Sequence, residues 1–358
     1  MLFTQQIWAD SWQSAVGTTV SSEYVTNPLL TPGYYGGVWR SLFVPSYALD
    51  GVDGANEIKT GLAYQIERTS NQTLSQDRQS PAAFIDWLRK SEMGDFDLSS
   101  KYAQIATRDS GVDATGVAQI GGTRTSKLFS GIWNYSLSEQ SLLSIVGSEE
   151  YVSYNGGYTV TSGFVDYDAQ TSSLKYSYNI SERSTPFLMV TNEKYSPVSV
   201  GTSDALTSEL LGWNLKGENT DWSLQAGRSQ DIEGKTNFLG SVEANYKVQF
   251  NTLDVTASHL VLPSGLGGFA CVDEKKLIWR HDLNDYNVAV WDFDDRVNSQ
   301  LPSGNGTTII TTVSIEHSIS TFWNLKTYYT YRAGQIAGSE GAFSNMLGLS
   351  FNFTNPDF

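Results

Sequence analysis

FLGSVEANYKVQF, the stretch at residues 238–250, alternates between two kinds of side chain. Val242 and Tyr246 share the even positions with other apolar or small residues, whereas Glu243 and Lys247 share most of the odd positions with polar ones. Successive side chains of a β-strand point to opposite faces. The stretch therefore predicts a strand with one apolar face and one polar face.

The same two-residue period recurs along most of the chain, and helical periodicity is almost absent. It is clearest in residues 129–137, 174–180, 323–332 and 347–353. In each of these ranges Leu, Phe, Trp or Tyr alternates with Ser, Asn, Lys or Arg. The sequence thus predicts an all-β protein built from half-apolar strands.

The connections between these stretches are of two kinds. Eight tight polar turns alternate with nine longer loops rich in Gly, Ser, Asn and Pro, such as 109–123 and 262–273. The alternation predicts about 18 antiparallel strands, with both termini on the side of the tight turns. Sixteen strands are the alternative, because residues 81–91 and 286–296 alternate poorly.

Composition narrows the classes of protein that fit. The net charge of −15 argues against a nucleic-acid binder, and a single cysteine excludes a disulfide framework within the chain. No window approaches the roughly 20 apolar residues of a membrane-spanning helix. Residues 1–10 carry no Lys or Arg and so lack the positive start of a signal peptide. Either the protein is not exported or the chain is the mature form of an exported protein, and the rest of the sequence favours the second.

Two architectures use half-apolar strands. A soluble sandwich or propeller buries the apolar face, whereas a membrane barrel turns that face to lipid and its polar face to a lumen. Strands of about 9–14 residues, the alternation of short and long connections, and aromatic residues near strand ends favour the barrel. We predict a single domain, 1–358, forming a transmembrane antiparallel up-and-down β-barrel.

The end of the chain carries a family resemblance. Residues 347–353, followed by Thr354-Asn355-Pro356-Asp357-Phe358, resemble the C-terminal targeting strand of bacterial outer-membrane β-barrels, which closes on an aromatic residue. Here Pro356 interrupts the alternation before Phe358. The resemblance implies a porin-like barrel in the outer membrane of a Gram-negative bacterium, in contact with its lipid, with Phe358 as the targeting residue.

A narrower resemblance concerns three short segments. Residues 74–78 (LSQDR), 123–126 (TRTS) and 263–269 (PSGLGGF) look like segments of a group of barrels associated with exopolysaccharide export in proteobacteria. This resemblance implies a channel for exopolysaccharide that works with a periplasmic polysaccharide-export protein. A passive diffusion porin for small polar solutes is the alternative. A structural or adhesive barrel with a closed lumen is the second alternative.

Few residues suggest catalysis. His259, His281 and His317 fall on three different predicted strands, and Cys271 has no basic neighbour before Lys275. Asp292, Asp294 and Asp295 form a weak candidate site for a hard cation, against the simpler interpretation of a solvated acidic loop. We therefore expect no enzyme, no cofactor and no nucleic-acid partner.

The predicted lumen provides the remaining candidate site. The pore-lining candidates share the polar face of the strands and mix both signs of charge: Lys59, Gln65, Glu67, Lys101, Lys175, Asn179, Lys216, Gln225, Glu243, Lys247, Asp254, Lys276, Arg280, Asp282, Lys326, Tyr328 and Arg332. The lipid-facing candidates share the apolar face: Val242, Tyr246, Trp133, Tyr176, Leu325 and Phe351. A passage of this composition suits a hydrated polymer or sugar, on which Tyr328 could stack. The equal alternative is that these residues only pair with one another and with the wall.

Overall fold

The computed structural model describes residues 11–33, 36–107, 122–155, 164–198, 203–265, 267–299, 305–336 and 340–355. Nearly all of these residues lie in strands and the turns that join them. No helix within these ranges is long and apolar enough to cross a membrane. Phe358 and most of the predicted loop 109–123 lie outside the described residues.

Eighteen strands are present in the described part of the chain, each of 12 to 17 residues. Their bounds are β1 (Ser11–Thr26), β2 (Gly37–Asp53), β3 (Asn56–Thr69), β4 (Arg78–Ser91), β5 (Gly94–Ala106), β6 (Thr123–Ser136), β7 (Ser141–Asn155), β8 (Tyr167–Tyr178), β9 (Ser184–Pro197), β10 (Asp204–Lys216), β11 (Thr220–Asp231), β12 (Thr236–Val248), β13 (Asn251–Pro263), β14 (Phe269–Asn284), β15 (Asn287–Ser299), β16 (Gly306–Ser318), β17 (Trp323–Ile336) and β18 (Ala342–Asn355).

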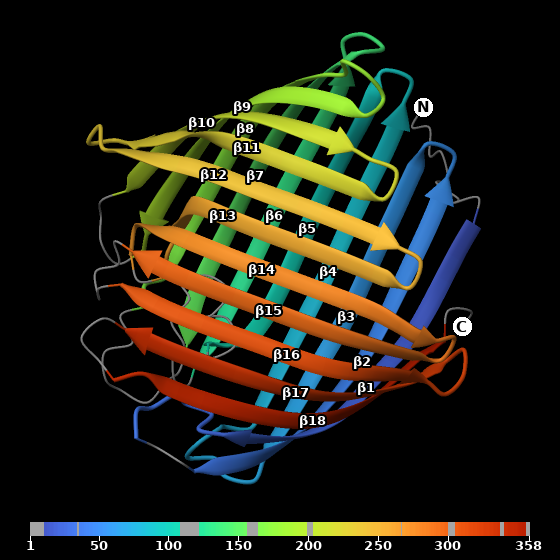
Figure 1. Ribbon diagram of the computed structural model, residues 1–358, viewed down its shortest axis with the longest axis vertical. Coiled ribbons are helices and arrows are strands. Elements are labelled where there is room, and N and C mark those ends of the chain that lie inside the picture. The colour runs from blue at the N-terminus through green and yellow to red at the C-terminus, as the bar shows by residue number, and fades with distance from the viewer. Residues whose placement is uncertain are drawn as a thin grey trace, which may run out of the picture.

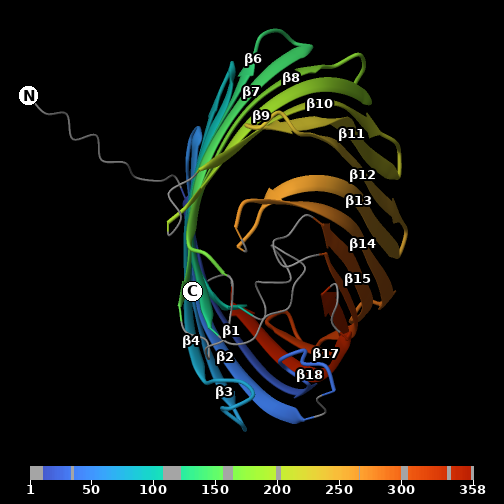
Figure 2. The same cartoon turned by 90° about the vertical axis from the view of Figure 1, so that its left-hand side faces the viewer.

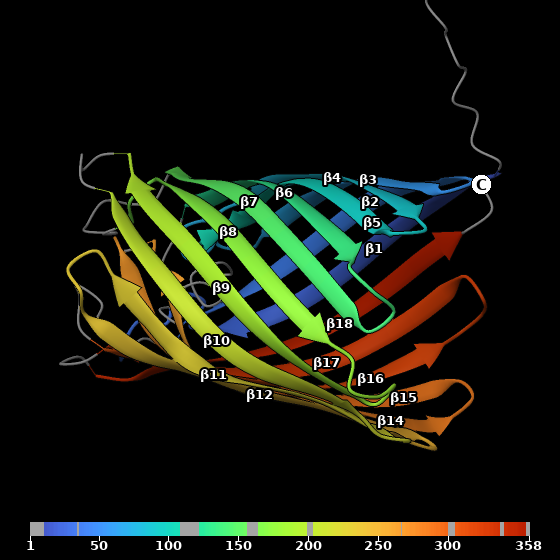
Figure 3. The same ribbon diagram turned by 90° about the horizontal axis from the view of Figure 1, so that it is seen from above.

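The strands close into a barrel (Figures 1 and 3). Each strand pairs antiparallel with the next along the chain, and β1 pairs with both β2 and β18. Val20, for example, lies opposite Phe43 on one side and Phe351 on the other. Closure leaves no edge strand with unpaired backbone groups. The predicted all-β, 18-stranded antiparallel barrel is confirmed.

Short and long connections alternate less strictly than predicted, because the connection between β11 and β12 (232–235) is shorter than the one between β8 and β9 (179–183). The tight turn that the sequence predicts at Asn251-Thr252 lies at Gln249-Phe250 instead, since Gln249 adopts a φ of 49° and Asn251 already begins β13. Strands also extend into predicted loops: β14 begins at Phe269, inside the predicted loop 262–273. The poorly alternating residues 81–91 and 286–296 form most of β4 and β15.

Alternation along the strands gives the barrel two different faces. The large apolar side chains at mid-strand positions are mostly exposed on one face, as Val242, Leu211 and Leu347 illustrate. The other face carries most of the buried polar side chains, including Glu23, Arg40 and Glu67. This is the reverse of a soluble protein, in which exposed apolar patches stay small.

The length of strand covered by outward apolar side chains differs around the barrel. On β18 it extends from Phe343 to Phe353, interrupted at Asn345. On β10 it extends only from Leu211 to Leu215. Beyond Leu211 the outer face of this sector becomes polar, and there the carboxylate of Glu209 accepts a hydrogen bond of 2.9 Å from Nη2 of Arg228 on β11. The neighbouring strand β9 continues the polar surface with Asn192 and Lys194.

Candidate functional site

One contact identifies which face of the sheet is the interior. The hydroxyl of Tyr195 on β9 donates a hydrogen bond of 3.1 Å to the carbonyl of Ser264, in the turn after β13. Three strands separate β9 from β13 in the sheet, so the two residues meet only across the inside of the barrel. The strand register extends this assignment along the paired strands, except at the inward end of the β13–β14 hairpin, where Val261 and Cys271 pack with Leu206 of the inner wall.

The strand register places the two sets of predicted residues on opposite faces of the barrel wall. Strand-borne pore-lining candidates such as Lys59, Lys101 and Glu243 share the inner face, while Asn179 lies in the turn just beyond β8, where its Oδ1 accepts a hydrogen bond of 2.8 Å from Thr185. All six lipid-facing candidates lie on the outer face. Their roles as pore-lining or lipid-facing residues stay a prediction.

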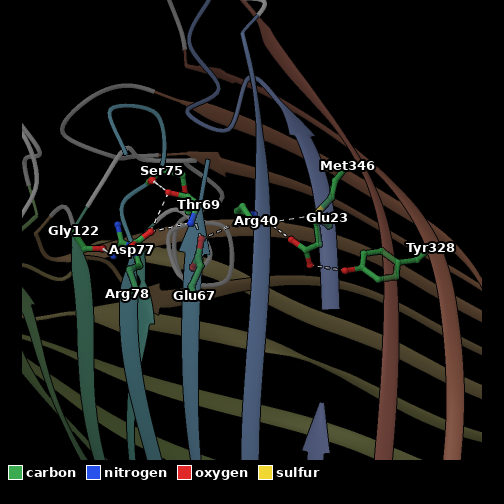
Figure 4. A network of polar contacts seen from close by, with 10 residues as sticks. All are labelled: Glu23, Arg40, Glu67, Thr69, Ser75, Asp77, Arg78, Gly122, Tyr328 and Met346. Carbon is green, nitrogen blue, oxygen red and sulfur yellow. Dashed lines mark hydrogen bonds and ion pairs between the residues drawn. The ribbon is translucent and has the colours of Figure 1, made fainter. Parts of the chain in front are cut away.

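Arg40 is the centre of a buried charged network on the inner wall (Figure 4). Its guanidinium contacts the carboxylate of Glu23 at 2.7 Å and that of Glu67 at 3.9 Å. Tyr328, on β17, donates a hydrogen bond of 2.5 Å to Glu23, and Ser75 donates one of 3.3 Å to Glu67. Four strands, β17, β1, β2 and β3, are thereby connected through side chains as well as through backbone.

The network continues toward the connection between β5 and β6. Asp77 accepts a hydrogen bond of 2.9 Å from the backbone N–H of Thr69, which fixes the short segment between β3 and β4. Arg78, the first residue of β4, donates a hydrogen bond to the carbonyl of Gly122. Figure 4 shows these groups in one row along the wall. Charged side chains therefore fix the ends of two connections, β3–β4 and β5–β6, to the barrel wall.

Other inner charges are also paired with the opposite sign. Arg296 contacts Glu274 at 2.6 Å and Asp294 at 3.1 Å, and Lys326 contacts Glu316 at 3.1 Å. Such mixed pairs recur around the wall, as at Arg124 and Glu150. The inner surface is therefore charged without a single dominant sign.

The turn between β13 and β14 folds into the barrel. Besides the bond from Tyr195, its Gly265 carbonyl accepts a hydrogen bond of 2.8 Å from the backbone N–H of Val165. Figure 2 shows the orange end of this hairpin inside the ring of strands. This Gly-rich segment is one of the three that resemble the export barrels, and its described residues lie inside the barrel.

Apolar packing holds this turn in place. Phe269 contacts two clusters of buried side chains on the wall: one contains Leu206 and Leu239, the other Tyr167 and Tyr195. Tyr195 is only 1% exposed. Glycines are needed here because Gly267 and Gly268 adopt φ values of 103° and 72°, which side chains disfavour. We call residues 263–269 the inward turn.

The histidines, the cysteine and the aspartates do not converge. Each histidine ring bonds to a neighbouring side chain on the outer face: His259 to Asp273 at 2.6 Å, and His281 and His317 to asparagines at 2.9 Å. Cys271 packs inside one of the apolar clusters beside the inward turn.

The three aspartates of the candidate cation site lie on two different faces of β15. Asp294 faces inward and pairs with Arg296, while Asp295 faces outward and lies 3.4 Å from the ammonium of Lys275. Within the described ranges, no three His, Cys, Asp or Glu side chains are grouped to hold a metal ion. Side chains on opposite faces of one strand cannot share an ion, so these three residues do not form a common site.

Several inner residues were not among the sequence candidates. Arg40, Glu23 and Arg124 all occupy the same face as the predicted residues of neighbouring strands. Extending the alternation to residues 11–26 and 37–53 would have placed the first two on this face. The partnership of Arg40 with Glu67 depends on the folded register, which the local pattern does not contain.

Comparison with known proteins gives a clear result for the fold alone. No protein-family model and no curated protein sequence matches the chain. Among solved structures, OccK9 (OpdG) of Pseudomonas aeruginosa aligns with a TM-score of 0.55 and 10% identity over 97% of this chain and 99% of that one. The fold is that of a bacterial porin.

Two further structures support the porin fold. The outer membrane protein OpdK of Pseudomonas aeruginosa, solved with vanillate, aligns with a TM-score of 0.53 and 8% identity over 97% of this chain and 100% of that one. A BenF-like porin of Pseudomonas fluorescens Pf-5 aligns with a TM-score of 0.51 and 10% identity over 97% and 100%. These neighbours do not support the predicted likeness to the exopolysaccharide-export group or its periplasmic partner.

Proposed function

We propose that this chain is a passive channel for small polar solutes in the outer membrane of a Gram-negative bacterium. Its outer face contacts lipid, and its inner face forms a hydrated passage. The inward turn carries the proposal, because it narrows a barrel of a size that otherwise leaves a wide aqueous channel. The structure of OpdK with vanillate, a small organic molecule, supports the proposal.

The structure of the inner wall favours small solutes, rather than a polymer, as the cargo of the channel. An extended polysaccharide needs an unobstructed path with repeated weak contacts, whereas here the inward turn is anchored by Tyr195 and packed through Phe269. Charges of both signs face the lumen, and salt bridges between them limit a strong preference for one kind of ion. The alternative of a diffusion porin therefore fits better than the export of exopolysaccharide.

Reconstitution tests the proposal. The purified chain should conduct ions in a planar lipid bilayer, and proteoliposomes should swell faster in arabinose than in the larger raffinose. Deletion of the gene should slow growth on limiting small nutrients and leave surface polysaccharide intact. Loss of polysaccharide with normal uptake would instead support export. Neither conductance nor swelling would support a closed structural barrel.

The inward turn gives a sharper expectation. Tyr195→Ala removes an aromatic ring from the cluster under the turn, and such truncations cost about 3–5 kcal/mol of local packing. The turn should then leave its docked position more often, so single-channel conductance and current noise should both rise. Tyr246→Ala, on the outer face of β12, is the matched control and should leave the current unchanged. Equal conductance in all three proteins would show that the turn does not limit the passage.

A further inference from the structure

Phe84 is an exception to the polarity of the inner wall. The large apolar side chains exposed at mid-strand positions mostly face outward, but Phe84 lies in the middle of β4 on the inner face and is 38% exposed. Its cross-strand neighbours are Gly61 on β3 and Lys101 on β5. An apolar ring left open to water in the middle of a polar passage loses the free energy of burial.

Gly61 positions the ring. A Cβ atom at residue 61 would collide with the ring of Phe84, so the ring occupies the space that a side chain would otherwise fill. One side of the ring thereby rests on the wall of the barrel, and the other is accessible from the lumen. A larger residue at position 61 would displace the ring.

Two other inner aromatic rings lie over glycines in the same way, and both have a partner. Phe187 crosses Gly212, and the ammonium of Lys175 lies 4.0 Å from its ring centroid. Tyr328 crosses Gly348 and bonds through its hydroxyl to the Arg40 network. Filling space over a glycine therefore explains a ring at such a position, but it does not explain the open face of Phe84.

A cavity surrounds the accessible side of the ring. Its volume is about 570 Å³, within the range of small-molecule sites. Small residues on the inner face of β1 to β5 form most of its floor: Ala15, Gly17, Ala48, Ala63, Ala82 and Ala103. Asp86 and Lys101 also line it. We call this cavity the Phe84 niche.

We propose that the Phe84 niche binds the aromatic part of a solute in transit through the pore. The ring of the solute stacks on Phe84, and its polar or charged part lies toward Asp86 and Lys101. This inference rests on the proposed channel function and adds a class of solute to it. An aromatic pair contributes beyond the burial of its area, yet weakly enough to allow passage.

The floor of the niche favours an aromatic ring over a sugar ring. Both have a flat apolar face that can stack on Phe84. The hydroxyl groups of a sugar, however, lose hydrogen bonds where alanine and glycine residues form most of the floor. An aromatic ring has no such requirement, so it gains more from the same cavity.

Two glucosides that differ in one group test the proposal. Phenyl β-D-glucoside and methyl β-D-glucoside are added in turn to the full chain in a planar bilayer while the ion current is recorded. The phenyl compound should interrupt the current at concentrations about two- to tenfold lower than the methyl compound, as expected for one aromatic pair. Interruption by both compounds at the same concentration would overturn the aromatic preference.

Variants locate the effect. Phe84→Ala should remove the difference between the two glucosides, Phe84→Trp should retain it, and Gly61→Leu should weaken it by displacing the ring. Phe343→Ala, on the outer face of β18, is the control and should behave as the unmodified chain. A difference that persists in Phe84→Ala would refute the niche while the current itself still supports a channel. A chain without ion current would refute the channel instead.

Discussion

Arg40→Ala should lower the free energy of unfolding by about 3–5 kcal/mol, the usual cost of removing one partner from a buried ion pair. The substitution leaves Glu23 and Glu67 facing each other without the guanidinium between them, and the Glu67 side chain is only 1% exposed. Their negative charges would then keep the hydrogen bonds from Tyr328 and Ser75 but lose the buried cation between them. Urea unfolding of the protein folded into lipid vesicles at neutral pH measures the loss.

Lys59→Ala is the matched control for Arg40→Ala. Its ammonium contacts the carboxylate of Glu57 at 2.6 Å on the same inner wall, but the Lys59 side chain is 50% exposed. Exposed pairs contribute about 0–1 kcal/mol, so this variant should unfold close to the unmodified chain. Adding Glu67→Gln to Arg40→Ala should recover part of the loss. Similar unfolding midpoints for Arg40→Ala and Lys59→Ala would show that burial does not decide the strength of the network.

Val242→Arg should lower the free energy of unfolding in a bilayer by about 2–4 kcal/mol. Val242 lies in the middle of β12, faces outward and is 44% exposed, so in the proposed membrane orientation the substitution places a charge in the hydrocarbon. Glu243→Gln, one residue away on the inner face, should change the free energy of unfolding little. The same urea titration in vesicles measures both.

The behaviour of the chain in buffer without detergent distinguishes a membrane barrel from a soluble sandwich. A soluble sandwich would also be destabilised by Val242→Arg, but it would remain folded and monodisperse in buffer without detergent. The unmodified chain should aggregate there, because large apolar side chains cover its outer face. A folded, monodisperse chain in plain buffer would contradict the membrane location.

The sequence was sufficient for most of the strands and for the two faces of those that alternate clearly. Period-two alternation records the two environments of a barrel wall, so the pattern alone assigns Val242 and Glu243 to opposite faces. The closure of β1 on β18 could not be read in the same way. It depends on pairing between segments more than 300 residues apart, such as Glu23 and Gly348.

The sites depended on contacts that no local pattern contains. Residues 263–269 are rich in glycine, which permits a turn in any direction; Tyr195, on a strand four positions away in the sheet, decides that the turn folds inward. The poor alternation of residues 81–91 had a physical cause, because Phe84 and Leu88 place apolar side chains on the inner face. A break in the pattern thus marked the niche.

The unequal height of the outer apolar surface has a consequence for the surrounding lipid. At about 3.3 Å per residue, the apolar stretch from Phe343 to Phe353 covers about 33 Å of strand, and that from Leu211 to Leu215 about 13 Å. A bilayer beside β10 must therefore thin, or the barrel must lean, to keep Glu209 and Arg228 out of the hydrocarbon. Two barrels that meet along this sector would release the deformed lipid between them. Crowding alone would then give neighbouring barrels a preferred mutual orientation.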